Sequence, residues 1–155
     1  DRPRVLPVMG AGFLRQVEDL PDGRFLVELA GVARIRMESE HPPERLYRKV
    51  QATLLEDDPH EVVAGEQGVE TLRLMLLALR SSHPQAATAL INLVEEERSP
   101  GVVADLLASA IVSDAHRRQE LLEQLDPLRR LDTIVQHLGE VLARLTGSQD
   151  QTQLN

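Results

Sequence analysis

The sequence predicts an α+β fold in which strands come first and helices follow. Apolar residues recur at about every second position in the first 56 residues, which is typical of half-buried strands. From residue 69 onward they recur with a period near 3.6, as in helices that pack on one face. The stretch between is acidic and interrupted by Pro59, Gly65 and Gly68, as in a linker. We therefore expect a β subdomain over 1–56, a linker over 57–68, a helical bundle over 69–146 and a polar tail over 147–155.

Two strand-like runs flank a tight turn near the start of the chain. Residues 25–30 alternate in the two-residue period of a strand, directly after Pro21-Asp22-Gly23. The proline and glycine of this tripeptide suit the backbone angles of a hairpin turn. We expect a second reversal at Ala30-Gly31 and a further strand over residues 47–55. Together these elements predict a small, strongly bent antiparallel sheet or barrel.

Five amphipathic segments follow the acidic stretch. Pro84, Pro100 and Pro127 stand at expected first helical positions, where the missing N–H costs nothing. The expected N-caps are Ser99, Asp126 and either Ser113 or Asp114. The last segment carries the longest apolar stripe, formed by Leu128, Leu131, Val135, Leu138, Leu142 and Leu145.

The composition restricts the classes of function. The net charge of −8 argues against nucleic acid as a partner, because phosphate contacts need clustered lysines and arginines. Without cysteine the chain has no disulfide, thiolate metal site or cysteine nucleophile. No run approaches the roughly 20 apolar residues that a membrane span needs, and no signal segment is visible. These features predict a cytoplasmic protein that does not bind membranes.

The sequence shows no arrangement of residues for catalysis or metal binding. The only lysine, Lys49, follows no glycine-rich turn, which excludes a phosphate-binding loop, and no serine is placed beside it. No two histidines are three or four residues apart, so a helical zinc motif is absent, and solvated positions are expected for all five. The acidic run at 95–97 fits a solvated helix end. We therefore predict a protein that is not an enzyme and needs neither cofactor nor metal. The histidines are His41, His60, His83, His116 and His137.

The order of several short motifs resembles the N-terminal, substrate-binding domain of the Lon protease family. The motifs are Leu20-Pro21-Asp22-Gly23-Arg24, the strand over 31–37, Gly101-Val102-Val103-Ala104-Asp105-Leu106, Gln119-Glu120-Leu121-Leu122, Asp126 and Arg130-Leu131. The resemblance implies a PUA-like β-barrel followed by a helical bundle, and substrate recognition without catalysis.

Two departures from the family pattern shape our expectations. A proline-rich strand and a helix that usually precede the equivalent of Val5-Leu6-Pro7 are not seen, so the barrel would be incomplete and would leave an open strand edge. The ATPase and peptidase modules of the full protease are not seen either. We therefore expect a stand-alone member of the family that lacks its first residues.

The leading hypothesis is a module that binds unfolded or tagged polypeptides, or a protease or ATPase partner, through apolar surface or a strand edge. The candidate residues are Phe13, Phe25, Leu26 and Met37, although a place in the core is the favoured interpretation for each. One alternative is an assembly module that forms a homo-oligomer through the open sheet edge or the last helix. Another is a fragment of a full-length ATP-dependent Lon protease.

Two arginines on one predicted strand raise a further question. Arg34 and Arg36 could form a basic face for an anionic ligand, but we favour their pairing with Glu28 or Glu38 across strands. RNA binding would need a concentrated basic patch, which the net charge disfavours. That patch would comprise Arg15, Arg34, Arg36 and Arg48.

Overall fold

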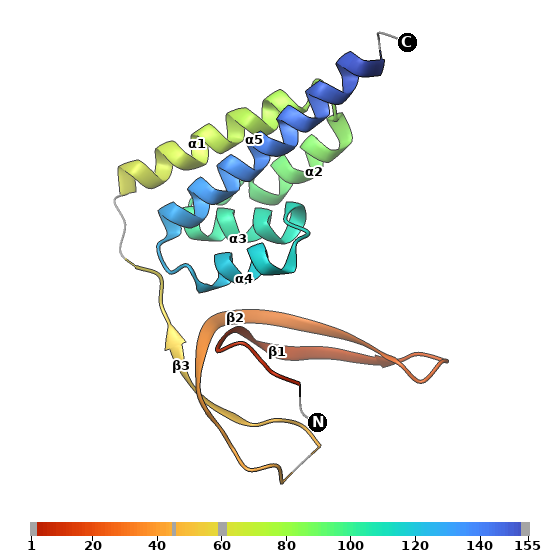
Figure 1. Ribbon diagram of the computed structural model, residues 1–155, viewed down its shortest axis with the longest axis vertical. Coiled ribbons are helices and arrows are strands. Elements are labelled where there is room, and N and C mark those ends of the chain that lie inside the picture. Colours follow the sequence, from red (N-terminus) through yellow and green to blue (C-terminus); the bar gives the residue numbers. More distant parts are fainter. Residues whose placement is uncertain (1–2, 45, 59–61, 153–155) are drawn as a thin grey trace. The chain divides into compact units, whose positions relative to one another are not determined.

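The computed structural model confirms the α+β fold, with strands in the first part of the chain and helices in the second (Figure 1). Backbone contacts divide the chain into two compact units, Asp1–Glu56 and Asp57–Asn155. The structure describes residues 3–44, 46–58 and 62–152, with side chains for all of these except 62, 63 and 145–152. Pro59 and His60 lie outside the described residues.

The first unit is an antiparallel sheet in the order β1-β2-β3. Its strands are β1 (Val8–Asp19), β2 (Phe25–Glu40) and β3 (Val50–Leu55), so β3 begins three residues later than expected. The turn between β1 and β2 follows the predicted chemistry: Gly23 adopts a φ of 81°, and its N–H donates to the carbonyl of Leu20 at 3.0 Å. Over the described residues the sheet stays open and does not close into a barrel.

The expected reversal at Ala30-Gly31 is wrong, because β2 continues through this point as one strand. The register slips here instead, and Val32 stands opposite no residue of β1. A Cβ atom on Gly12 would lie 2.5 Å from the carbonyl oxygen of Ala30, so a side chain at this position would prevent the close approach of the two strands. The glycines therefore mark a β-bulge, which adds twist to a strand without ending it.

The second unit contains five helices over its described residues. They are α1 (Val62–Leu79), α2 (Pro84–Val94), α3 (Pro100–Ile111), α4 (Ala115–Glu123) and α5 (Pro127–Thr152). Three of them begin at the expected prolines. Helix α1 begins within the segment that we expected to be a linker, and α5 continues into the expected tail. None of the described helices combines the length and apolar character that a membrane span requires.

Side-chain oxygens cap the helix starts in two of the three predicted places. Asp114 accepts the main-chain N–H of Arg117 at 2.8 Å, and Asp126 accepts two N–H groups of the first turn of α5. Ser99 occupies the N-cap position of α3, but its hydroxyl makes no capping bond. Glu97 Oε1 accepts the main-chain N–H of Ser99 at 2.8 Å instead.

The core of the second unit is aliphatic and is supplied mainly by α1, α3 and α5. Its buried residues are Val69, Leu72, Leu76, Val94, Val103, Ala104, Leu107, Val112, Leu121, Leu131, Ile134 and Leu138. In the stripe of α5, Leu131 and Leu138 are buried, while Leu128, Val135 and Leu142 are half-buried. From Leu128 to Leu142, the apolar stripe of α5 therefore packs within the bundle itself. This is the stripe that we had considered for an oligomer interface.

Candidate functional site

The predicted binding residues lie mostly on a two-stranded projection of the first unit. β3 pairs only with residues 34–40 of β2, so β1 and β2 continue beyond it as an isolated pair that ends at the 20–24 turn. Figure 1 shows this pair as the long orange hairpin next to the short β3. We call residues 12–31 the hairpin arm.

Three of the four predicted binding residues lie on the hairpin arm and are exposed. The exposed fraction is 64% for Phe13, 63% for Phe25 and 59% for Leu26. The favoured interpretation of these three as core is therefore wrong. Met37 lies outside the arm, is half-buried and pairs with Ala52 of β3. The structure thus brings three candidates onto one element and leaves the fourth in the body of the sheet.

The strand register sorts the side chains of the arm onto two faces. Paired residues of antiparallel strands project to the same side, and side chains alternate along each strand. The face that we call the apolar face has one carboxylate at its tip, Asp19, and five hydrophobic residues: Leu14, Val17, Phe25, Val27 and Leu29. The mixed face carries Phe13, Gln16, Glu18, Leu26, Glu28 and Ala30.

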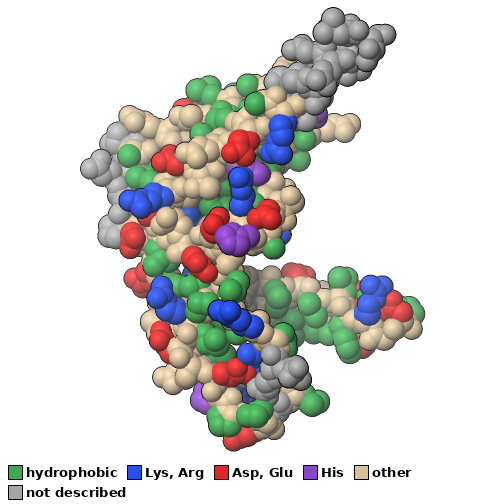
Figure 2. All heavy atoms as spheres, in the orientation of Figure 1, with side chains coloured by type: hydrophobic (Ala, Val, Ile, Leu, Met, Phe, Trp, Pro, Cys, Tyr) green, Lys and Arg blue, Asp and Glu red, His purple; other side chains and the backbone are tan. Residues whose placement is uncertain are grey.

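The apolar face is large for an uncovered surface. Each of its five hydrophobic residues exposes between 49% and 66% of its surface. At about 150–200 Å² for a free side chain of this kind, the patch measures roughly 500 Å², which is near the upper end of what monomeric proteins expose. Figure 2 shows hydrophobic side chains along the arm in green. A patch of this size makes the apolar face a candidate binding surface.

Sequence reasoning missed four residues of the apolar face: Leu14, Val17, Val27 and Leu29. The alternation of residues 25–30 was the available signal, and it correctly shows which side chains share a face. Alternation does not show whether another layer covers that face. The usual assumption that the apolar side is buried therefore led to the wrong conclusion about exposure.

The hairpin arm carries four carboxylates and two arginines. Arg24 Nε donates to Asp22 Oδ2 at 2.7 Å, and this side-chain hydrogen bond, with a second from the main-chain N–H of Arg24, lowers the pKa of Asp22. Glu18, Asp19 and Glu28 form no ion pair within the described part of the chain. The arm is therefore acidic and would attract a basic partner.

The predicted pairing of Arg34 and Arg36 across strands is wrong for a topological reason. Because β2 does not reverse at residue 31, Glu28 and Glu38 lie on the same strand as both arginines and cannot face them across the sheet. Glu38 accepts a hydrogen bond from the hydroxyl of Thr53 on β3 at 3.1 Å.

The structure pairs one arginine of the candidate basic patch with a carboxylate and places another on the hairpin arm. Arg48 donates two hydrogen bonds to the carboxylate of Glu40, at 2.9 and 2.6 Å, which raise the pKa of Arg48. Arg15 lies on the hairpin arm, where it stands opposite no residue of β2. Arg15 therefore lies several residues along β1 from Gly10 and Val8, which stand opposite Arg34 and Arg36.

The second unit has an open groove of about 320 Å³ between α4 and α5. Arg117 Nη1 lies 3.0 Å from His137 Nδ1 and 3.3 Å from Glu140 Oε2 at its rim. No serine or threonine hydroxyl contacts this histidine within the described residues, so the groove holds no nucleophile and base pair. The described residues also contain no cluster of three potential metal ligands. His137 is mostly buried, unlike the solvated position expected for it.

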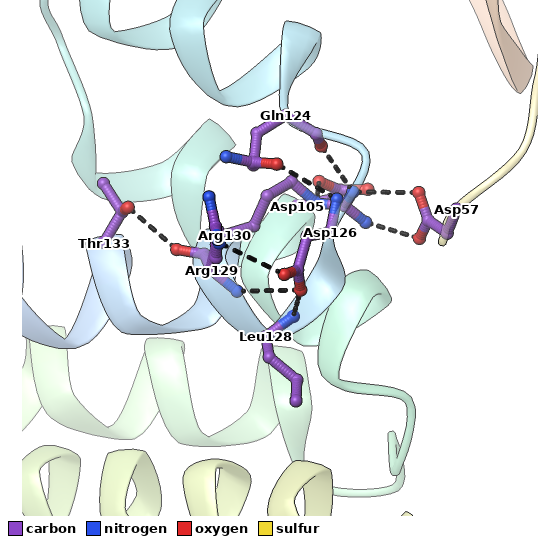
Figure 3. A network of polar contacts seen from close by, with 8 residues as sticks. All are labelled: Asp57, Asp105, Gln124, Asp126, Leu128, Arg129, Arg130 and Thr133. Atoms are coloured by element: carbon purple, nitrogen blue, oxygen red, sulfur yellow. Dashed lines mark hydrogen bonds and ion pairs between the residues drawn. The ribbon is translucent and has the colours of Figure 1, made fainter. Parts of the chain in front are cut away.

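A buried arginine organises the start of the second unit (Figure 3). Arg130 donates from Nη1 and Nη2 to the two carboxylate oxygens of Asp57, at 2.8 and 2.5 Å, and from Nη1 to the carbonyl of Gln124 at 2.7 Å. Its Nε lies 3.3 Å from Asp105 Oδ1. We call this group of four residues the Arg130 clamp. Its role is structural, because the Arg130 side chain is fully buried and both of its Nη atoms donate to protein groups.

Gly101 allows the Arg130 clamp to close. A Cβ atom at this position would lie 2.6 Å from Arg130 Nη2 and 2.7 Å from Asp57 Oδ2. Both distances are shorter than ordinary contacts, so only glycine fits without moving the ion pair. Gly101, Asp105 and Arg130 all belong to the sequence motifs described above.

Comparison with known proteins gives one consistent result. Residues 3–140 match the family described as the ATP-dependent protease La (LON) substrate-binding domain. The chain is 31% identical over 126 residues to a Lon protease of Geobacter metallireducens and 31% identical over 131 residues to one of Syntrophus aciditrophicus. These matches cover 78% and 80% of this chain but only 15% and 16% of those relatives.

Solved structures show the same fold. The N-terminal domain of Mycobacterium avium complex Lon protease superposes with a TM-score of 0.71 at 19% identity, covering 89% of this chain and 73% of that one. A Lon N-terminal domain protein from Xanthomonas campestris superposes with a TM-score of 0.54 at 18% identity, covering 84% and 67%. At these identities the likeness concerns the fold alone.

Proposed function

Because this chain belongs to the family of the Lon substrate-binding domain, we propose that it binds unfolded polypeptides and does no chemistry on them. Family membership supports a role in substrate recognition. The observation that carries the finer proposal is the apolar face of the hairpin arm, whose five hydrophobic residues are all exposed. An unfolded polypeptide exposes the apolar side chains that a folded protein buries, so it can cover this face where a folded protein cannot.

The proposal assigns the chemistry that follows binding to other protein modules. The relatives matched by this chain are proteases, and the chain spans about 15% of their length. The matched region is their substrate-binding part, and we expect a protease or ATPase partner to act on the polypeptide that this chain holds.

Fluorescence anisotropy tests the proposal directly. The probe is a labelled small domain that destabilising core substitutions keep unfolded, and its folded parent is the comparison. We expect binding of the unfolded form only. Phe25→Thr combined with Leu29→Thr keeps β propensity but removes apolar area, and should weaken binding at least about tenfold. Leu74→Gln, at an exposed leucine of α1, is the matched control and should leave affinity unchanged.

Two results would overturn the proposal. The first is equal affinity for the folded and unfolded probes. The second is absence of binding together with a mass that rises with protein concentration in light scattering, which would support an assembly module that pairs its own copies through the sheet.

A further inference from the structure

The chain between the two units has very little length that is not anchored. β3 stays paired with β2 as far as Leu55, which stands opposite Arg34. The second unit anchors the chain from Asp57 onward, because both carboxylate oxygens of Asp57 accept from Arg130. Glu56 lies between these two points, is exposed, and has no partner on β2 among the described residues. One residue therefore connects the two anchored segments.

A second contact holds the chain directly after Asp57. The main-chain N–H of Asp58 donates to the carbonyl of Leu125 at 2.9 Å. Leu125 lies between α4 and α5 and follows Gln124, whose carbonyl accepts from Arg130. The side chain of Asp57 and the main chain of Asp58 are thus bound to the same part of the helical unit.

The Arg130 clamp gives this anchor a rigid base. Its guanidinium belongs to α5, while Asp105 belongs to α3 and Gln124 follows the last residue of α4. Figure 3 shows Asp57 on the connecting chain with its carboxylate directed at the guanidinium. A buried arginine that donates two bonds to one carboxylate fixes both the position and the orientation of that carboxylate. Three helices therefore hold the end of the connection.

We propose that Glu56 is a hinge between the two units and that the Arg130 clamp keeps this hinge one residue long. The inference is independent of what the hairpin arm binds. Hinges are a few residues that absorb the change in φ and ψ, and a single residue can do so. Two steps of about 3.8 Å separate the Cα atoms of Leu55 and Asp57, so these atoms stay within about 7.6 Å in any orientation.

The length of the hinge determines how well the two units act together. A one-residue hinge permits rotation but almost no separation. Loss of the Arg130 clamp would add Asp57 and Asp58 to the free connector and extend its reach by up to about 7 Å. The effective concentration of one unit near the other falls as a flexible connector lengthens. A partner that contacts both units would therefore bind more weakly without the clamp.

Distances between two spin labels test the inference in the intact chain. The sequence contains no cysteine, so Gln51→Cys on β3 and Gln85→Cys on α2 place one label on each unit and nowhere else. Both positions are exposed. Double electron–electron resonance then measures the distribution of distances between the labels, which we expect to be confined to a limited range in the parent.

Three changes to the connector separate the clamp from other effects. Asp57→Ala should broaden the distribution and extend its upper edge by up to about 7 Å. Asp58→Ala is the matched control, because it removes the same atoms and charge but keeps the main-chain N–H, the only group of Asp58 that is bonded among the described residues. It should leave the distribution unchanged. Insertion of Gly-Ser after Glu56 adds two residues with the clamp intact, and should broaden the distribution as Asp57→Ala does.

Circular dichroism at 222 nm checks that each variant keeps its helices. If Asp57→Ala unfolds the second unit, Asp57→Asn takes its place, since it keeps the shape of the side chain and should broaden the distribution to a smaller extent. A distribution that is unchanged by loss of the carboxylate but broadened by the insertion would refute the role given to the clamp.

The hinge itself has its own contrary result. A parent distribution as broad as that of the insertion variant would refute the one-residue hinge, and so would an insertion that changes nothing. Neither result affects the proposed function, because the anisotropy experiment decides polypeptide binding separately.

Discussion

Replacement of Arg130 by alanine should destabilise the second unit more than any change at a neighbouring surface arginine. The Arg130 guanidinium is fully buried and holds Asp57 through two hydrogen bonds. Without it the carbonyl of Gln124 loses a donor at 2.7 Å, and Asp105 loses the ion pair with Nε. The change would therefore release the first residues of the unit from α5.

The magnitude follows from burial. Removal of one partner from a fully buried ion pair costs about 3–5 kcal/mol. The carboxylates of Asp57 and Asp105 remain 38% and 39% exposed, so water can solvate them after the change and the electrostatic loss is smaller. The two methylene groups that alanine lacks, Cγ and Cδ, each lose about 0.8 kcal/mol of apolar burial. We expect a total loss of about 3 kcal/mol in the free energy of unfolding.

Urea denaturation followed by circular dichroism at 222 nm measures this loss, because the helices of the second unit dominate the signal. With an m-value of about 1.5 kcal/mol/M, the midpoint should fall by roughly 2 M. Arg129→Ala is the matched control, since Arg129 is 75% exposed and, within the part of the chain that the structure describes, pairs only with Asp126 at 3.3 Å. Its loss should stay below about 1 kcal/mol. Equal midpoints for the two variants would refute the structural role given to the Arg130 clamp.

Three further predictions concern two glycines and a titrating carboxyl group. In the same urea experiment, Gly139→Ala should add about 1 kcal/mol of stability, because its Cβ would meet only Met75 Cε at 3.7 Å. Gly101→Ala should remove about 1–3 kcal/mol by forcing the Arg130 clamp apart, and a stabilising effect there would contradict the geometry. By NMR titration, Arg24→Gln should raise the pKa of Asp22 toward 3.8. The folded-state pKa of Asp22 is lowered, so the stability that Asp22 contributes is present above pH 3.8 and is lost as the pH falls through its folded-state pKa. The difference in unfolding free energy between the two variants should therefore be constant from pH 5 to 8. A difference that changes over this range would contradict the assignment.

Local signals in the sequence predicted most of the helical unit. Pro84, Pro100 and Pro127 mark helix starts because their effect on the backbone acts within one turn. The pair Ala30-Gly31 was misleading, since glycine permits both a reversal and a bulge and only the register distinguishes them. The ion pair between Asp57 and Arg130 joins residues 73 positions apart, so no periodicity or local motif could reveal it.

The two units differ in how they use their hydrophobic residues, and this difference supports the function proposed for the hairpin arm. The second unit collects twelve buried hydrophobic residues into one cluster. Among the described residues of the first unit only Val8 is fully buried, while the hairpin arm leaves its apolar face open. Two strands with an uncovered apolar face gain little from burial, so strand pairing and the turn at Gly23 must maintain the arm. Any extended chain that covered this face would supply the apolar contacts that the arm lacks, which gives binding there a driving force without any catalytic group.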